Sequence, residues 1–184
     1  SAIRDLKQLE VVTFGSGALA DLSPLRDCPQ ILKLYFGSCL LIKDISPLPN
    51  LKNLIALEFS GCPAISDLSP IAGMSQLEIF GINSCVTVKD ISVIRNFKRL
   101  AQINLTSVAC DTAPLRDLTT LKTIFFPSSV TAADIRTVIK NNPNLTDIYL
   151  RININIPELS DIDFSKAKTL CLPSTIRQDQ LAAI

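Results

Sequence analysis

The chain has 184 residues, of which 47% are apolar, and its 18 basic and 17 acidic side chains leave a formal charge of +1. This length and apolar content suit one domain or one continuous array of repeats. The charges are scattered, so no basic surface for nucleic acid or for an anionic membrane is expected. The longest apolar runs are much shorter than the roughly 20 residues that span a bilayer, so no membrane insertion is expected either.

One apolar motif recurs along the whole chain, and its clearest copy is Leu54–Cys62. Each copy has an apolar anchor, with further apolar residues two and five positions before it, and successive anchors lie 21 to 24 residues apart. The anchors are Phe14, Phe36, Phe59, Ile82, Leu105, Phe126, Leu150 and Leu172. Recurrence in register at such a period is the signature of a repeat array.

The repeats predict a stack of parallel strands. Alternation of the last two apolar positions is typical of a short strand with one face turned inward. About twenty residues carry the chain around to the next copy, so successive strands are expected to run parallel and side by side, as in a solenoid. Eight strands at about 4.8 Å spacing would form a sheet about 35 to 40 Å long.

The return segments share the pattern Asp-Leu/Ile-Ser-Pro, at Asp21–Leu25, Asp44–Leu48 and Asp67–Ile71. This pattern predicts Ser at a helix N-cap and Pro at the first helical position, followed by a single helical or 3-10 turn. The aligned Asp residues are expected to accept hydrogen bonds from local backbone N–H groups rather than to hold a cation.

A longer helix is expected near residues 131–141. Thr131 is the expected N-cap and Asp134 its capping-box partner, with Val130 and Ile135 as a hydrophobic staple. The Asn141-Asn142-Pro143 sequence is expected to end this helix. The segment 126–130, which leads into this helix, is echoed at 172–176, and Leu181 after it takes the place of Ile135.

With these motifs laid out, the chain resembles the leucine-rich repeat family over nearly its whole length. The Leu-x-x-Leu-x-Phe-x-x-Cys motif at 54–62 carries the resemblance, and Asp-Ile/Leu-Ser-Pro is similar to the return segments of bacterial internalins. The Ser-Gly-Cys ending resembles repeats of bacterial receptor-like proteins and secreted effectors. The resemblance implies an α/β horseshoe of about eight coils, with a parallel sheet on the concave face and short turns on the convex side, that binds proteins.

Residues 1–184 are expected to form a single leucine-rich repeat domain. The sequence begins and ends inside a repeat, and neither end shows the polar cap that protects repeat arrays. We therefore expect a fragment of a longer protein, with both native caps missing.

The six cysteines fit the repeat better than a disulfide framework. Cys39, Cys62 and Cys85 lie 23 residues apart, at the position where most of the family has Asn. Small buried thiols suit the interior of a coil, and parallel Cβ vectors oppose the disulfide dihedral. Reduced and buried thiols favour a reducing compartment, so the chain is expected in the cytoplasm or, as an effector, in a host cytosol. Export to the surface is the less favoured localisation.

No catalytic constellation is present. The absence of histidine removes Ser-His-Asp and Cys-His nucleophiles, and the absence of Cys-x-x-Cys argues against a zinc site. Gly15–Ala20 follows the Gly-x-Gly-x-x-Ala pattern, but no βαβ unit follows it, as a dinucleotide site requires. We expect no enzyme activity, no metal and no cofactor.

The expected binding surface is the concave face, where residues one and three positions before each anchor point outward. Aromatic and charged side chains, which binding hot spots favour, are found among them. The irregular copies after Leu105 are expected to carry most of the specificity. The candidate partner-binding residues are Lys33, Tyr35, Glu58, Ile79, Gln102, Asn104, Phe125, Asp147, Tyr149 and Arg151.

The sequence thus predicts a monomeric, non-catalytic scaffold that binds a protein partner, as part of a bacterial effector or receptor-like protein. One alternative is a ligand-sensing repeat module of a larger enzyme or signalling protein whose active domain lies outside this segment. Another is a surface adhesin or a structural spacer.

Overall fold

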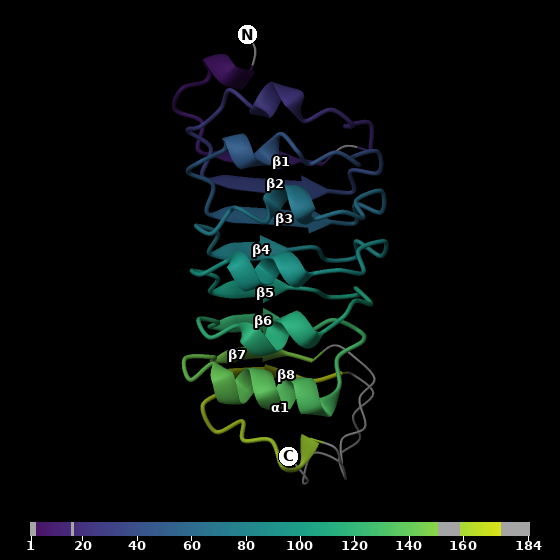
Figure 1. Ribbon diagram of the computed structural model, residues 1–184, viewed down its shortest axis with the longest axis vertical. Coiled ribbons are helices and arrows are strands. Elements are labelled where there is room, and N and C mark those ends of the chain that lie inside the picture. Colours follow the sequence, from purple (N-terminus) through teal and green to yellow (C-terminus); the bar gives the residue numbers. More distant parts are fainter. Residues whose placement is uncertain (1–2, 16, 151–158, 174–184) are drawn as a thin grey trace.

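The computed structural model describes residues 3–15, 17–150 and 159–173. Its strands form one parallel sheet in the order β1 to β8, with consecutive strands always adjacent (Figure 1). The strands are β1 Val11–Phe14, β2 Lys33–Gly37, β3 Ala56–Ser60, β4 Ile79–Gly81, β5 Gln102–Asn104, β6 Thr123–Phe125, β7 Asp147–Tyr149 and β8 Thr169–Cys171. This confirms the predicted solenoid of eight parallel strands.

The register of the sheet follows the sequence repeat residue for residue. Leu34 lies beside Leu57, Leu57 beside Phe80, and Phe80 beside Ile103. These side chains point inward and are fully buried. Because each inward position lies beside the same position of the next coil, one apolar core runs through all the coils.

Aromatic anchors reinforce this core in the first coils. The rings of Phe14 and Phe36 are stacked with centroids 5.4 Å apart, and those of Phe36 and Phe59 are 4.9 Å apart. Such pairs stabilise a fold by about 0.5–1.5 kcal/mol beyond the burial of their area.

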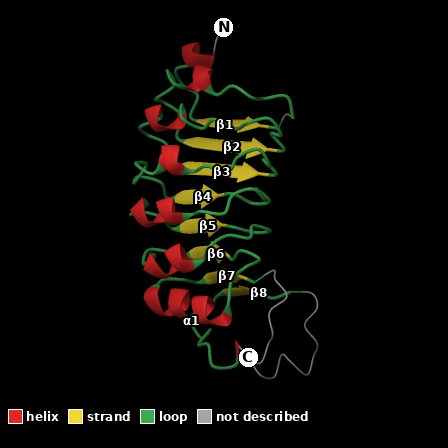
Figure 2. Ribbon diagram, turned by 45° about the vertical axis from the view of Figure 1, so that its right-hand side comes forward, coloured by secondary structure: helices red, strands yellow, loops and turns green. Residues whose placement is uncertain are grey.

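Helical segments cover the opposite side of the solenoid from the sheet, as Figure 2 shows. Most are single 3-10 turns, because few residues separate each turn from the next strand. They are η1 Ile3–Asp5, η2 Ser23–Leu25, η3 Leu48–Asn50, η4 Ser69–Ile71, η5 Ser92–Asn96 and η6 Ala113–Asp117. Their inward residues, such as Leu25, Leu48 and Ile71, are buried and close the core on this side.

The predicted Ser N-caps are wrong, because the preceding Asp takes their role. Ser23 and Ser69 are the first residues of η2 and η4, and no side chain caps these turns at the residue before. Instead, the Ser23 backbone N–H donates to Asp21 Oδ1 at 2.8 Å, and the Ser23 hydroxyl donates to Asp21 Oδ2 at 2.8 Å. In the second copy the turn starts only at Leu48, after Pro47. The expected bonding of the Asp column to local backbone is confirmed.

The one longer helix is where the sequence predicts it. Helix α1 spans Ala132–Asn141, with Thr131 as N-cap and Asp134 as its capping-box partner. After its last residue, the buried Asn142 side chain accepts a hydrogen bond from the Leu121 N–H at 2.9 Å and donates to the Leu118 carbonyl at 2.8 Å. The end of α1 is thereby tied to the coil before it.

A buried carboxylate links α1 to the neighbouring turn η6. Asp134 accepts hydrogen bonds from the hydroxyls of Thr131 at 2.7 Å and Thr112 at 2.9 Å, and forms an ion pair with Arg116 at 2.7 Å. Burial opposes ionisation, but the Thr131 and Arg116 bonds together outweigh it and hold the pKa of Asp134 below its usual value.

The turns after β2, β3, β4 and β5 each contain a left-handed residue. Two positions after the anchors, Ser38, Gly61, Ser84 and Ser107 have φ of 54°, 64°, 57° and 60°. A residue with a side chain is rarely found in this region, because its Cβ crowds the following carbonyl. Gly61 is the copy that adopts the turn without that cost.

Five of the six cysteines are buried, and the structure has all six as free thiols. The thiols of Cys39, Cys62 and Cys85 donate weak hydrogen bonds at 3.6–3.9 Å to carbonyls of their own coil and of the preceding one. They therefore fill one column of the buried core, at the same position of successive coils. Cys171, which is partly exposed on β8, is the exception to the predicted burial.

We expect Gly61→Ala to lower the free energy of unfolding by about 1 kcal/mol, since Ala must then adopt a left-handed backbone. Gly73→Ala is the matched control: a Cβ there meets no atom within 4 Å, and its φ is not positive. Urea unfolding of both variants measures the difference. Equal stability of the two variants would contradict the conformational explanation.

Asp134→Asn should lower the free energy of unfolding at pH 7 by about 2 kcal/mol, because the hydroxyl and guanidinium donors lose the buried charged acceptor that they share. The folded pKa is depressed, so Asp134 stabilises the protein above its unfolded pKa, near 4, and this contribution disappears as pH falls through the folded pKa. The gap between variant and parent, measured by urea unfolding, should narrow between pH 5 and pH 2. Asp117→Asn, at an exposed ion pair with Arg95, should change stability by less than about 1 kcal/mol.

A chromogenic disulfide reagent should react rapidly with one thiol of the native chain and with all six after denaturation, since only Cys171 is partly exposed. Burial raises the pKa of Cys110 to about 11, which further suppresses its thiolate. Cys171→Ser should abolish the rapid reaction and Cys110→Ser should leave it. Rapid reaction of several thiols in the native chain would contradict the burial of the other five cysteines.

Candidate protein-binding surface

The outward side of the sheet, called the sheet face below, brings together the residues predicted to bind a partner. Its first row contains Lys33, Ala56, Ile79, Gln102, Thr123 and Asp147, and its second row contains Tyr35, Glu58, Gly81, Asn104, Phe125 and Tyr149. Nine of the ten candidates lie in these two rows. The tenth, Arg151, is outside the described residues.

An aromatic pair dominates the C-terminal half of the sheet face. The rings of Phe125 on β6 and Tyr149 on β7 are stacked with centroids 3.9 Å apart and planes inclined by 6°. Both side chains are partly exposed, and the register places Cys171 next to Tyr149. The pair therefore offers a rigid apolar platform at the surface of a sheet.

Charge in the N-terminal half centres on Glu58 of β3. Burial raises the pKa of Glu58 above its ordinary value. Tyr35, its neighbour in the second row, has a raised pKa because it is partly buried and because Glu58 is close. Glu58 is half-buried and lies beside Tyr35 in the sheet register, so its carboxylate is partly removed from water.

Two residues of the outward rows are covered although they lie on the outward side of the sheet. Ala56 is only 1% exposed, and Gly81 is buried. A Cβ added to Gly81 would lie 3.2 Å from Cγ and Oε1 of Glu58 and 3.4 Å from Cβ of Asn104, so larger neighbours close over the glycine. The signal in the sequence is that these are the smallest residues of the two rows.

Some predicted polar residues are already occupied within the chain. Hydrogen bonds from Thr169 and Thr146 lower the pKa of Asp147, and the Thr146 hydroxyl lies 2.8 Å from its carboxylate. Asn104 Oδ1 accepts the Thr106 backbone N–H at 3.1 Å. These side chains have less capacity left for a partner than Lys33 and Glu58, for which the described residues provide no hydrogen bond or ion pair.

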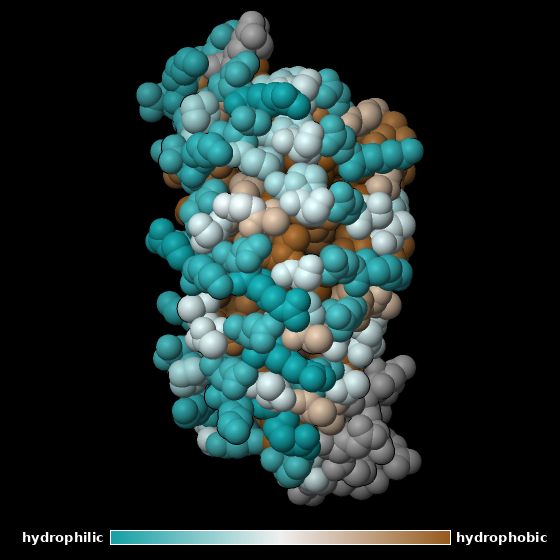
Figure 3. Space-filling view, in the orientation of Figure 1, coloured by the Kyte–Doolittle hydropathy of each residue, from teal (hydrophilic) through white to brown (hydrophobic). Residues whose placement is uncertain are grey.

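An exposed apolar edge, which the sequence analysis missed, follows the strand ends. Leu40, Leu41 and Val86 are 52%, 53% and 54% exposed in the loops after β2 and β4. Figure 3 views the helical side, which is largely hydrophilic, and shows hydrophobic surface gathered toward the upper right, where the strand ends lie. The same repeat position holds Ala18, Pro63 and Ala109, so apolar residues at a fixed distance after each anchor are the signal.

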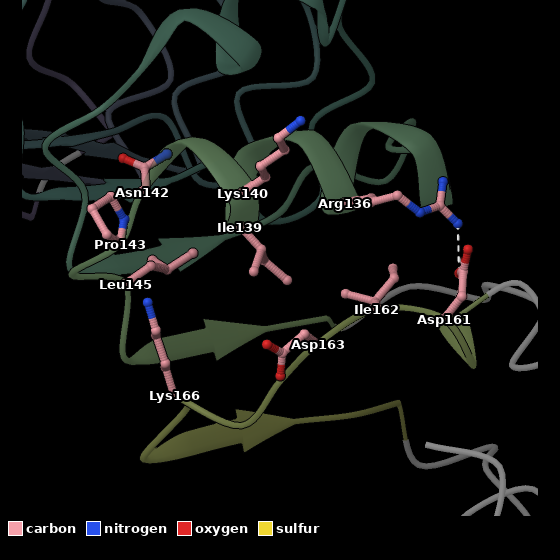
Figure 4. Close-up of a pocket in the computed structure, with 10 residues that line it drawn as sticks. All are labelled: Arg136, Ile139, Lys140, Asn142, Pro143, Leu145, Asp161, Ile162, Asp163 and Lys166. Carbon is pink, nitrogen blue, oxygen red and sulfur yellow. Dashed lines mark hydrogen bonds and ion pairs between the residues drawn. The ribbon is translucent and has the colours of Figure 1, made fainter.

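A cavity of about 310 Å³ lies on the helical side, between α1 and the coil before β8 (Figure 4). Ile139, Leu145 and Ile162 form its apolar part. Its charged groups are largely engaged: Arg136 pairs with Asp161 at 2.6 Å, and Asp163 accepts the Ser165 N–H at 2.9 Å. The cavity reflects imperfect stacking of the last coil on the longer helix α1, and it lacks a convergent set of free polar groups.

The described residues provide neither a metal-binding cluster nor a membrane-spanning helix. No three acidic or cysteine side chains there are grouped so that they could hold a metal ion. No helix among them has the length and the apolar character that crossing a membrane requires.

The comparisons with known proteins identify the fold. No protein-family model matches the chain, and neither does any curated protein. Among solved structures, the internalin InlF of Listeria monocytogenes is 23% identical with a TM-score of 0.56, and the match covers 89% of this chain and 61% of that one. A leucine-rich-repeat protein of Leptospira interrogans is 14% identical with a TM-score of 0.63, covering 99% and 60%. In the mouse RP105/MD-1 complex the matching chain is 18% identical with a TM-score of 0.51, covering 95% and 36%.

The chain therefore spans about three fifths of the two bacterial proteins. Their identities to it are low, so the likeness concerns the fold. The eight parallel strands in repeat register agree with that likeness. The chain has the leucine-rich-repeat fold.

Proposed function

We propose that this chain is a non-catalytic protein-binding module whose sheet face contacts the partner. The observation that carries the proposal is the stacked Phe125–Tyr149 pair, partly exposed on an open sheet. Aromatic anchors supply much of the energy of protein interfaces. An open sheet of eight strands suits a macromolecule, since small ligands are held in enclosed pockets.

Two comparisons support a protein partner and a bacterial context. The mouse structure that shares this fold is titled a complex of RP105 with MD-1, and the two bacterial proteins share the fold along most of this chain. We further propose that the chain is part of a bacterial effector or receptor-like protein and acts as a monomer in the cytoplasm or in a host cytosol. A sensor module of a larger enzyme, an adhesin and a spacer are the alternatives.

The apolar edge is a second candidate binding surface. Its exposed Leu40, Leu41 and Val86 are three of the five exposed large apolar side chains of the described chain. Contiguous exposed apolar residues mark interaction sites more often than isolated ones do. A test of the sheet face must therefore include this edge as a comparison.

The triple variant Tyr35→Ala, Phe125→Ala, Tyr149→Ala should abolish capture of cellular or host proteins by the immobilised chain. Truncation of one anchor costs about 2 kcal/mol, which is about thirtyfold in Kd. Proteins captured by the parent chain are identified by mass spectrometry, and the Kd of the leading one is then measured for each variant. Circular dichroism melting verifies that every variant is folded.

The matched control is Leu40→Ser, Leu41→Ser, Val86→Ser, which changes the apolar edge and leaves the sheet face intact. Its Kd should equal that of the parent. Unchanged binding by the aromatic variant, with loss of binding by the control, would transfer the function to the apolar edge. A spacer would show no specific capture by any of the three proteins.

A further inference from the structure

We propose that the sheet face binds an arginine side chain of the partner, with the guanidinium placed beside Tyr35 and against the Glu58 carboxylate, which itself lies over Gly81. This inference rests on the proposed function, because it names the chemistry of the partner at the same face. It also moves part of the specificity into the regular copies, where the sequence analysis expects less of it.

The Glu58 carboxylate lies where a partner's side chain can reach it. A Cβ on Gly81 would lie only 3.2 Å from Cγ and Oε1 of Glu58, so Glu58 leans along the second row and lies over the glycine of β4. In the first row, Ala56 adds no bulk beside it. The shortest side chains of the sheet face thus adjoin Glu58, and a partner's side chain can approach the carboxylate closely.

No described residue of the chain compensates the charge of the Glu58 carboxylate. Among the described residues, the Glu58 side chain has neither a hydrogen bond nor an ion pair, although burial disfavours its charged form. Two other acidic residues at the sheet are matched: Glu78 lies 2.8 Å from Arg99, and Asp147 accepts bonds from threonines. A partly desolvated and unpaired carboxylate costs free energy that a cation from outside can recover.

A guanidinium suits this carboxylate better than a metal ion or an ammonium does. A single carboxylate does not hold a divalent metal, which needs several oxygen ligands. A guanidinium binds a carboxylate through two parallel N–H···O bonds and stacks on aromatic rings, and it is more weakly hydrated than an ammonium. Tyr35 is the register neighbour of Glu58 and provides the ring for a cation–π contact.

Lys33 does not satisfy this carboxylate from within the chain. It lies in the first row of β2, diagonal to Glu58, and no ion pair joins the two. Its ammonium stays available for an acidic group of the partner. The N-terminal half of the sheet face therefore presents one charge of each sign.

The test is a titration of the isotope-labelled 184-residue chain with N-acetyl-arginine methylamide, followed by amide NMR shifts. Shifts should concentrate at Ala56, Glu58 and Gly81. N-acetyl-citrulline methylamide, which has the same shape without the charge, should produce none, and N-acetyl-lysine methylamide should bind more weakly. Arginine affinity should fall at least about fivefold in Glu58→Gln, as expected for a charge-assisted hydrogen bond.

Glu78→Gln is the matched control, since Glu78 is already paired with Arg99, and its arginine affinity should equal that of the parent. Glu58→Gln should melt at the same temperature as the parent or higher, because a partly desolvated charge is removed. Weakened binding together with undiminished stability identifies a ligand site rather than a structural residue.

Shifts of equal size in the parent and in Glu58→Gln, or no localised shifts at all, would overturn the proposal. Those results would leave the proposed function standing if partner capture still depends on Tyr35, Phe125 and Tyr149. Conversely, arginine binding at Glu58 together with partner capture that does not depend on Tyr35, Phe125 and Tyr149 would support the arginine site and contradict the proposed function.

Discussion

The whole structure depends on parallel strand pairing without a shift of register from one coil to the next. Each strand hydrogen-bonds to the next with equivalent residues side by side, over all seven pairs. A slip by one residue would turn every inward side chain of that strand outward. The apolar column through Leu34, Leu57 and Phe80 therefore both requires this register and enforces it. The 3-10 turns, the cysteine column and the sheet face all inherit their alignment from it.

The register explains why the strands could be predicted from the sequence and why several local features could not. Three apolar positions, repeated in every coil, leave one way to bury them all, so the outward rows with Tyr35 and Phe125 follow directly. The left-handed Ser38, Ser84 and Ser107 escaped prediction because serine carries no marker of positive φ. The capping side chain was assigned two residues too late, to Ser23 instead of Asp21, since both residues carry side chains able to cap.

The sequence predicts which residues form the two outward rows, but it does not predict which of their side chains are free to contact a partner. Whether an outward residue is free depends on side chains in adjacent strands. Glu58 covers Gly81, while Thr146 and Thr169 occupy Asp147. The cavity beside Ile162 arises from the fit between α1 and the following coil, for which the repeat has no counterpart elsewhere. Features that arise between unlike coils are outside the reach of a periodic pattern.

The even stacking of strands also makes the sheet face a molecular ruler. Glu58 on β3 and Phe125 on β6 occupy the same row, three strand steps apart. At about 4.8 Å a step, the two groups are held about 14 Å apart. The two strands between them, β4 and β5, set this separation, and β4 has only Gly81 in this row. A partner that uses both groups is thus selected by the distance between its own two contacts as much as by their chemistry.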